Sequence, residues 1–189
     1  MTMRMRITLP AIAVLTVLLP GKAAVWAADG YEHFGAAIYA RAYEVREMAD
    51  LDLLRARFEV MEKHVKVSKM YLETHRDKIL VDSETLKTAK RFFEERGILT
   101  AGGITLTVDE RNRFETFCYS DPDHRRWVQE VVEHTARHFD DIILDDFFFT
   151  SCKSEVEIRA RGERSWTEYR RALLDEAAEL QALGLVVEP

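Results

Sequence analysis

The chain lacks the motifs of several large enzyme classes, and it has few cysteines and prolines. Among its 189 residues are two cysteines and four prolines, with no glycine-rich nucleotide-binding fingerprint, no G-x-S-x-G elbow and no H-E-x-x-H zinc motif. The pair Gly102-Gly103 is not followed by the helix start of a phosphate loop. Two cysteines without a matching histidine pattern do not make a zinc site. We therefore expect no nucleotide chemistry, no cofactor and no structural metal.

Clustered basic charge is also missing. Lysine and arginine together number 27 against 33 aspartates and glutamates, which gives a formal net charge of −6. A polyanion-binding protein needs clustered Lys and Arg to neutralise phosphates, and no such cluster with interleaved aromatic residues stands out. Nucleic acid is therefore disfavoured as a partner.

No apolar run is long enough to span a membrane, although the N-terminus is apolar. A short basic start precedes the run Ile7–Leu19, and small residues precede a cleavage point after Ala27. The run is shorter than the roughly 20 residues that a membrane-spanning helix needs. We expect a signal peptide over residues 1–27 and one secreted or periplasmic domain over residues 28–189, with no membrane span after cleavage. An uncleaved N-terminal anchor is the alternative.

The order of apolar runs and helical patterns predicts the fold class. Four β-rich runs alternate with helical patterns, and the fourth run has the continuous apolar centre of a strand buried in a parallel sheet. The expected strands are Ala36–Tyr43, Val67–Thr74, Ile98–Thr107 and Asp141–Phe149. This alternation predicts an α/β fold of about four parallel (β/α) units. Right-handed crossovers bring the carboxyl ends of all strands to one edge, where ligands bind.

Local signals give the bounds of the helices. We expect helices at Asp50–Val65, at Ser83–Arg96 before the terminator Gly97, after the cap Asp121-Pro122, and after the capping box Ser165–Glu168. The first helix should turn a stripe of four apolar residues toward the core: Leu51, Leu54, Phe58 and Met61.

Two adjacent acids, Asp145 and Asp146, end the apolar centre of the fourth run. A carboxylate at the end of a buried strand must reach the rim or find a partner, and adjacent strand residues point to opposite faces. At most one of them can therefore face a barrel interior. Such a carboxylate suits a glycosidic nucleophile, a general acid or base, or a ligand for a hard metal ion. The alternative is structural: one aspartate caps the next turn and the other pairs with an arginine.

Other polar and aromatic residues are expected at the same edge. The candidates for substrate binding are Arg41, Glu73, His75, Thr105 and Asn112. Glu73 and His75 are expected to share one face, although a histidine here also fits a hydrogen-bonded loop, and Thr105 and Asn112 also suit ordinary turn bonding. Aromatic rings beside carboxylates suit a carbohydrate, because sugar C–H faces pack on rings while hydroxyls form hydrogen bonds.

The two cysteines, Cys118 and Cys152, follow the third and fourth strands, so loops at one edge can bring them together. A disulfide and two free buried thiols both fit this placement.

Five segments, taken as a set, resemble secreted bacterial glycoside hydrolases with a TIM-barrel catalytic domain. These segments are Tyr71–Asp77, Ala101–Thr105, Arg111–Phe114, Phe117–Tyr119 and Ile142–Thr150. The barrel of that family is similar to retaining α-glycosidases such as α-galactosidases, in which an aspartate ending strand four is the nucleophile. The resemblance therefore implies that Asp145 or Asp146 is catalytic.

The same resemblance implies an incomplete barrel. A whole (β/α) barrel takes about 250 residues, and the acid/base carboxylate of the similar α-glycosidases comes from its second half. We therefore expect a truncated glycoside hydrolase whose partners are a carbohydrate and either a second copy or a complementing second half. The alternatives are a non-catalytic sugar-binding or dimerising half barrel, and a metal-dependent hydrolase using Asp145, Asp146, Glu73 and His75.

Overall fold

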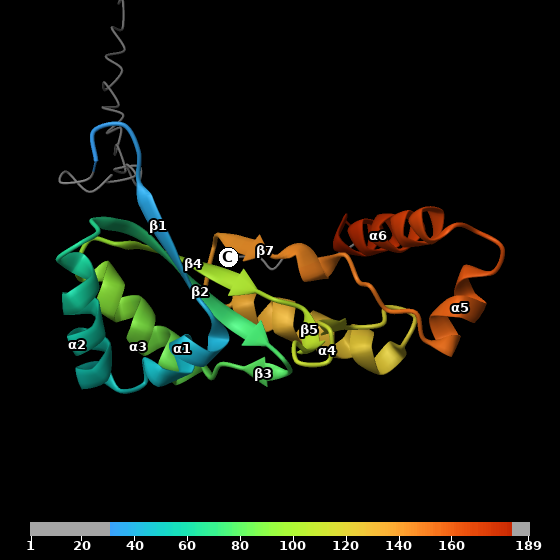
Figure 1. Cartoon of the computed structure of the whole chain (residues 1–189), viewed down its shortest axis with the longest axis horizontal. Helices are drawn as coiled ribbons and strands as arrows, with labels where there is room; N and C mark the ends of the chain where they lie inside the picture. Colours follow the sequence, from blue (N-terminus) through green and yellow to red (C-terminus); the bar gives the residue numbers. More distant parts are fainter. Residues whose placement is uncertain (1–30, 183–189) are drawn as a thin grey trace, which may run out of the picture.

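The central element of the computed structural model is a mostly parallel sheet (Figure 1). The structure describes residues 31–182, so the expected signal peptide lies outside the described residues. Within that span the parallel strands run in the order β1 (Ala36–Ala40), β2 (Val67–Arg76), β4 (Leu99–Ile104) and β7 (Ile142–Leu144). Consecutive strands are neighbours, as in the wall of a (β/α) barrel, without the order reversal of a doubly wound sheet. The predicted α/β fold of parallel (β/α) units is confirmed.

Helices connect the parallel strands and pack on one face of the sheet (Figure 1). The connections contain α1 (Ala42–Glu47) with α2 (Leu51–Glu62), then α3 (Ser83–Glu94), then α4 (Pro122–Ala136), and α5 (Glu155–Arg161) and α6 (Trp166–Ala182) follow β7. The core under β1, β2 and β4 includes Phe58, Leu72 and Phe93, while Val131 of α4 packs against Ile104. None of the helices within residues 31–182 combines the length and hydropathy needed to cross a bilayer.

The predicted helix starts are confirmed. The Asp121 carboxylate accepts from the backbone N–H of Asp123 and His124, with Pro122 in the first turn. Ser165 and Glu168 form the reciprocal capping box, because each side chain accepts from the backbone N–H of the other. Helix α3 ends before Gly97, whose φ of 73° is easily adopted only by glycine.

The predicted strand ends are wrong in three places. The first strand stops at Ala40, so Tyr43 lies in α1. The third run divides into β4 and the strand β5 (Thr107–Asp109), which pairs with β6 (Glu115–Thr116). The fourth strand stops at Leu144, and the 3₁₀ helix η1 (Asp146–Phe148) follows it. In this segment the N–H of Phe148 bonds to the carbonyl of Asp145, which turns the chain out of the sheet.

Two smaller differences complete the description. The two-residue strand β3 (Ile79–Leu80) pairs antiparallel with the end of β2, and its turn residues Asp77 and Lys78 both have positive φ. Leu51, predicted to face the core, is 42% exposed because it begins α2 at the surface.

The adjacent glycines of β4 allow close approach on both faces of the sheet. A Cβ at Gly102 would lie 2.7 Å from the Thr135 side chain of α4, and a Cβ at Gly103 would lie 2.6 Å from the hydroxyl of Tyr39. Both separations are too short for a real side chain, so glycine is needed at each position. Gly103 thereby lets Tyr39 reach across the face of the sheet that α4 does not cover.

Candidate functional site

A buried polar network lies on the face of the sheet opposite α4, and Glu73 of β2 is at its centre. Glu73 is completely buried. Its carboxylate accepts hydrogen bonds from the Tyr39 hydroxyl at 2.7 Å, the Ala42 N–H at 2.6 Å, two nitrogens of Arg76 at 2.8 Å each, and the Thr105 hydroxyl. These donors occupy both carboxylate oxygens, so Glu73 organises the end of the sheet and offers no free oxygen to a ligand.

The charges of this network stabilise one another. Although burial opposes the charge of Arg76, the Glu73 carboxylate raises the Arg76 pKa above its usual range. Burial, together with the negative charge of Glu73, also raises the pKa of Tyr39. Tyr39 therefore remains a donor. Arg76 is also paired with Glu110, so one guanidinium joins β2 to the β5–β6 hairpin.

Asp145 is joined to this network through Thr105. The Thr105 hydroxyl lies 2.6 Å from Asp145 Oδ2 and is also in contact with Glu73, while an Arg76 nitrogen donates to it at 3.0 Å. A hydroxyl has one proton, so Thr105 can donate to only one of the two carboxylates at a time. The Asp145 backbone is fixed as well, because its N–H donates to the carbonyl of Ile104 at 3.1 Å.

Asp145 and Asp146 differ in their surroundings. Asp145 is partly buried. Burial of the Tyr119 phenol, together with the negative charge of Asp145, raises the pKa of Tyr119. The Tyr119 hydroxyl donates to the carbonyl of Phe148, in the turn that follows Asp145, at 2.8 Å. Asp146 is exposed and begins η1. Of the two acids, Asp145 is the one held among the strand ends.

His75 does not share a face with Glu73, contrary to the prediction. The pairing of β2 with β4 is irregular between Glu73 and His75, and this bulge turns the imidazole toward α4. Its Nδ1 lies 2.7 Å from the carbonyl of Thr105, and its Nε2 accepts from the Trp127 indole N–H at 3.0 Å. The ring is completely buried and both nitrogens have partners, so His75 holds β2, β4 and α4 together.

The burial of His75 predicts a pH dependence of stability. Burial lowers the pKa of His75 from its ordinary value of 6.5, so the folded chain resists a proton that the unfolded chain accepts. The contribution of His75 is therefore fully present above about pH 6.5, and it is lost as the pH falls from there toward the lowered native pKa. Urea unfolding between about pH 7.5 and 5 should show stability decreasing with acid, and His75→Gln should reduce that slope. An unchanged slope in His75→Gln would contradict this account. His64→Gln is the control, because His64 is exposed and its replacement removes no buried imidazole.

Arg41 and Asn112 are engaged locally. Arg41 is exposed at the start of α1 and pairs with Glu44. Asn112 is exposed in the β5–β6 hairpin, where its Nδ2 donates to Glu115 at 2.8 Å. Neither interaction brings these two side chains into the network around Glu73.

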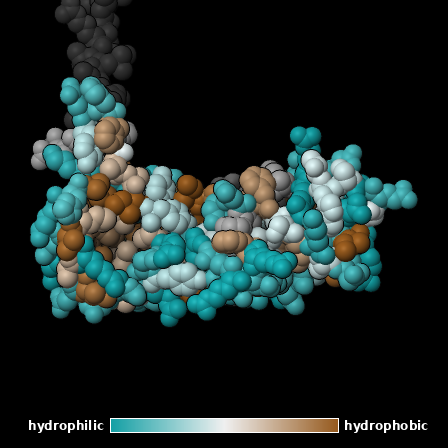
Figure 2. Space-filling view, in the orientation of Figure 1, coloured by the Kyte–Doolittle hydropathy of each residue, from teal (hydrophilic) through white to brown (hydrophobic). Residues whose placement is uncertain are grey.

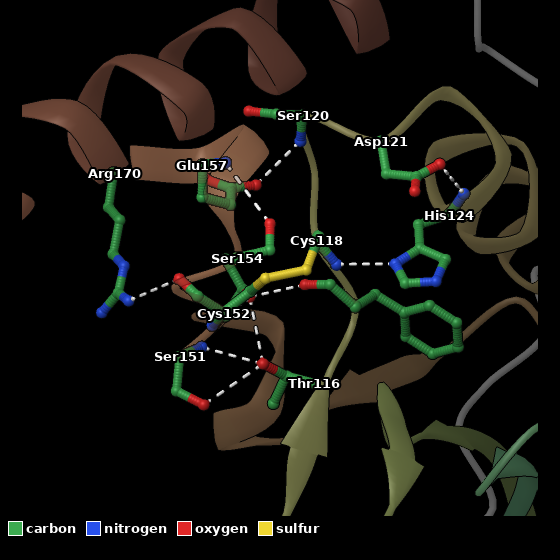
Figure 3. Close-up of a disulfide and its surroundings, with 12 residues drawn as sticks. Thr116, Cys118, Ser120, Asp121, His124, Ser151, Cys152, Ser154, Glu157 and Arg170 are labelled. Atoms are coloured by element: carbon green, nitrogen blue, oxygen red, sulfur yellow. Dashed lines mark hydrogen bonds between the residues drawn. A yellow bond between two sulfur atoms is a disulfide. The ribbon is translucent and has the colours of Figure 1, made fainter. Parts of the chain in front are cut away.

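Cys118 and Cys152 form a disulfide with a Cα–Cα distance of 5.3 Å (Figure 3). It joins the segment after β6 to the segment after η1. Beside it the buried Glu157 of α5 accepts from the Ser120 N–H at 2.9 Å, and the Thr116 hydroxyl accepts from the Ser151 N–H at 2.9 Å. The disulfide therefore fixes the chain that leaves the Asp145 segment.

Comparison with known proteins identifies the family. Residues 23–189 match the family model described as "Probable glycosyl hydrolase, catalytic domain". The chain belongs to this family. It is also 36% identical, over 104 residues, to an uncharacterized protein of Saccharolobus solfataricus. That match covers 51% of this chain and 17% of the relative, so the chain spans less than a fifth of the relative's length. No solved structure matches the chain.

In this glycosyl hydrolase domain, several residues of the network were not predicted as site residues. Tyr39 and Arg76 bond to Glu73, and Asp77 accepts from the Tyr43 hydroxyl and from Thr107 at 2.7 Å. Arg76 and Asp77 stand in the Tyr71–Asp77 motif, which was a usable signal. For Tyr39 the signal was weaker, because only its approach to Gly103 places it beside Glu73.

Among the described residues, the side chains that could together bind a metal ion lie at the disulfide and not in the network around Glu73. Ligand atoms of Cys118, Cys152 and Glu157 lie within 4.8 Å of one another, but the two sulfurs are bonded together. The sequence also suggests Glu73 and His75 as metal ligands. The carboxylate oxygens of Glu73 and both ring nitrogens of His75 already form hydrogen bonds within the protein.

A separate hollow of about 370 Å³ lies between β1, α1 and α2. Its apolar lining includes Ile38, Phe58 and Met70, and Arg41 and Glu44 lie at the polar side. Figure 2 shows hydrophobic residues gathered at this end of the molecule. Asp145 does not line the hollow, but Tyr39 does, and Tyr39 bonds to Glu73, so the hollow adjoins the network at that residue.

Proposed function

We propose that this glycosyl hydrolase domain cleaves O-glycosidic bonds with Asp145 as its nucleophilic carboxylate. The observation that supports this proposal is the position of Asp145: a partly buried acid at the strand ends, with one oxygen bonded to Thr105. Active sites of (β/α) barrels lie at the carboxyl edge of the strands, and the position of Asp145 directly after β7 at that edge supports a nucleophilic role.

The reaction needs a second carboxyl group about 5 Å from the first, to protonate the leaving oxygen. Glu73 is unsuited to that role, because two nitrogens of Arg76 and the N–H of Ala42 already bond to its oxygens. We propose that the acid/base residue comes from a further segment or a second chain that completes a TIM barrel with this sheet. The length of the relative, of which this chain covers 17%, is compatible with additional segments. The signal pattern over residues 1–27 supports export, as in the secreted bacterial hydrolases that the motifs resemble.

Covalent trapping tests the proposal without the acid/base residue. Glycosyl fluorides with an additional ring fluorine need little protonation of the leaving group, and the ring fluorine slows breakdown of the product. An oxygen of Asp145 would attack the anomeric carbon, the C–F bond would break, and fluoride would leave as the glycosyl ester forms. Mass spectrometry of the digested protein should locate this ester on Asp145.

Asp146→Asn is the matched control and should still be labelled, whereas Asp145→Asn should not. A label on another carboxylate would show that Asp145 is not the nucleophile. The trapping reagents should cover both anomers of a panel of common hexoses. If none of them labels the protein but a sugar binds saturably, the result would favour the non-catalytic sugar-binding alternative.

A further inference from the structure

Three cationic groups lie within 5.6 Å of the centroid of the indole ring of Trp166. The charged atoms of Lys153, Arg161 and Arg170 lie 5.6, 5.0 and 5.2 Å from the ring centroid. We name these four residues the Trp166 cluster. They come from the loop before α5, the end of α5, and α6, and Figure 1 shows these elements at one end of the molecule. Hydrophilic residues dominate this end in Figure 2.

The positive charges of the cluster lack anionic partners. Within the part of the chain that the structure describes, none of the three cations forms an ion pair with a carboxylate. Arg170 donates to the carbonyl of Cys152 at 3.3 Å, and Arg161 donates to the carbonyl of Arg164. Arg161 Nε is buried and has no hydrogen-bond partner, which leaves one donor unused.

Two acids of the same segments make their hydrogen bonds outside the cluster. The buried Glu157 carboxylate accepts from the N–H of Ser120, and Glu168 is held by Ser165 in the capping box of α6. The first turn of α6, which begins at Trp166, adds partial positive charge to the same place. A ring can attract a cation at each face, but three like charges around one ring repel one another. A bound anion would remove that repulsion.

We propose that the Trp166 cluster is a binding site for one anionic group, a carboxylate or sulfate carried by a saccharide. Guanidinium groups bind such oxyanions through paired charge-assisted hydrogen bonds, and an indole ring suits the apolar face of a sugar. That a saccharide carries the anionic group rests on the proposed glycosidase function. The proposal does not depend on the role of Asp145. Three cations around one ring match a single charged group and not the extended charge of a nucleic acid.

The cluster was not recognisable in the sequence. Acidic residues interrupt the basic ones between Arg159 and Arg171, and Lys153 belongs to a separate loop. Only the packing of α5 and the loop before it against the start of α6 brings these charges to one indole ring.

Calorimetric titration of the full chain tests the site with paired probes. The probes are oligogalacturonate, the same oligosaccharide fully methyl-esterified, a sulfated galactan oligosaccharide, its desulfated form, and sodium sulfate. We expect saturable binding of at least one acidic oligosaccharide, weakened about tenfold or more when its charge is removed, as expected for loss of a charge-assisted hydrogen bond. Lys153→Gln and Arg170→Gln should each weaken that binding several-fold.

The control variant is Arg91→Gln, which makes the same charge change on α3, far along the sequence. Lys153 is an exposed loop residue whose ammonium lies over the Trp166 ring, so Lys153→Gln leaves the fold intact. Equal binding of charged and uncharged oligosaccharides would overturn the proposal. Equal effects of Lys153→Gln and Arg91→Gln on binding would also overturn it. The same holds if sodium sulfate binds but no oligosaccharide does, or if none of the probes binds.

Discussion

Replacing Glu73 by alanine is expected to lower the free energy of unfolding by about 3–5 kcal/mol, the usual cost of breaking a buried ion pair. The Glu73 carboxylate has no exposure to solvent, and the Arg76 side chain is only 12% exposed. Loss of the carboxylate leaves Arg76, the Tyr39 hydroxyl and the N–H of Ala42 without their acceptor. Urea unfolding followed by circular dichroism measures the change.

Glu110→Gln provides the matched control for Glu73→Ala. Glu110 pairs with the same guanidinium, but its side chain is 21% exposed and contacts it from the hairpin side. We expect a loss of about 1 kcal/mol, because water compensates a partly exposed pair. The double variant Glu73→Ala/Arg76→Ala should lose less than the sum of the single losses, because neither buried partner is left without the other and the partly exposed Glu110 can turn to water. Equal losses for Glu110→Gln and Glu73→Ala would show that Glu73 is not the centre of the network.

The sequence was sufficient to predict the fold class because its local signals agree with one another. The helix starts at Asp121 and Ser165 each rely on a side chain a few residues from the backbone groups that it caps, so sequence spacing alone identifies them. Strand ends depend on contacts far along the chain. The apolar run after Asp146 predicted a longer strand, but Phe148 packs near Tyr119 and the chain turns there. Hydrophobicity alone does not distinguish a strand from such a turn.

The candidate site was predictable in its members more than in their roles. Glu73, His75, Thr105 and Asp145 do end the central strands, as the alternation of elements required. Their orientation depends on one bulge in β2, which turns His75 toward Trp127 and leaves Glu73 facing Thr105. A bulge shifts the alternation of side chains between the two faces of the strand by one position. None of the residue types in Glu73–His75 predicts a bulge there. The contacts of the Thr105 hydroxyl with the Glu73 and Asp145 carboxylates likewise could not be predicted from the sequence, because they join residues in or directly after three different strands.

Asp145→Asn is expected to lower kcat/KM by at least about a thousandfold, as the loss of a covalent nucleophile does. The amide keeps the size of the side chain and can still accept from Thr105, so the network around Glu73 should persist. The substrate should be a dinitrophenyl glycoside of a sugar that the trapping experiment identifies. Its leaving group needs little protonation, so kcat/KM, which covers the steps up to formation of the glycosyl ester, reports the carboxylate and not the acid/base residue. Asp146→Asn should retain most of the activity, because Asp146 is exposed and begins η1.

Chemical rescue distinguishes a nucleophile from a residue that only positions others. Asp145→Gly should open space beside Thr105 into which azide can enter and attack the anomeric carbon in place of the carboxylate. The expected product is a glycosyl azide of inverted configuration, because the second displacement by water is absent. Thr105→Val should not be rescued by azide, since it removes a hydrogen bond and leaves the Asp145 carboxylate in place. Rescue of Thr105→Val, or a glycosyl azide of retained configuration from Asp145→Gly, would place the attacking group elsewhere.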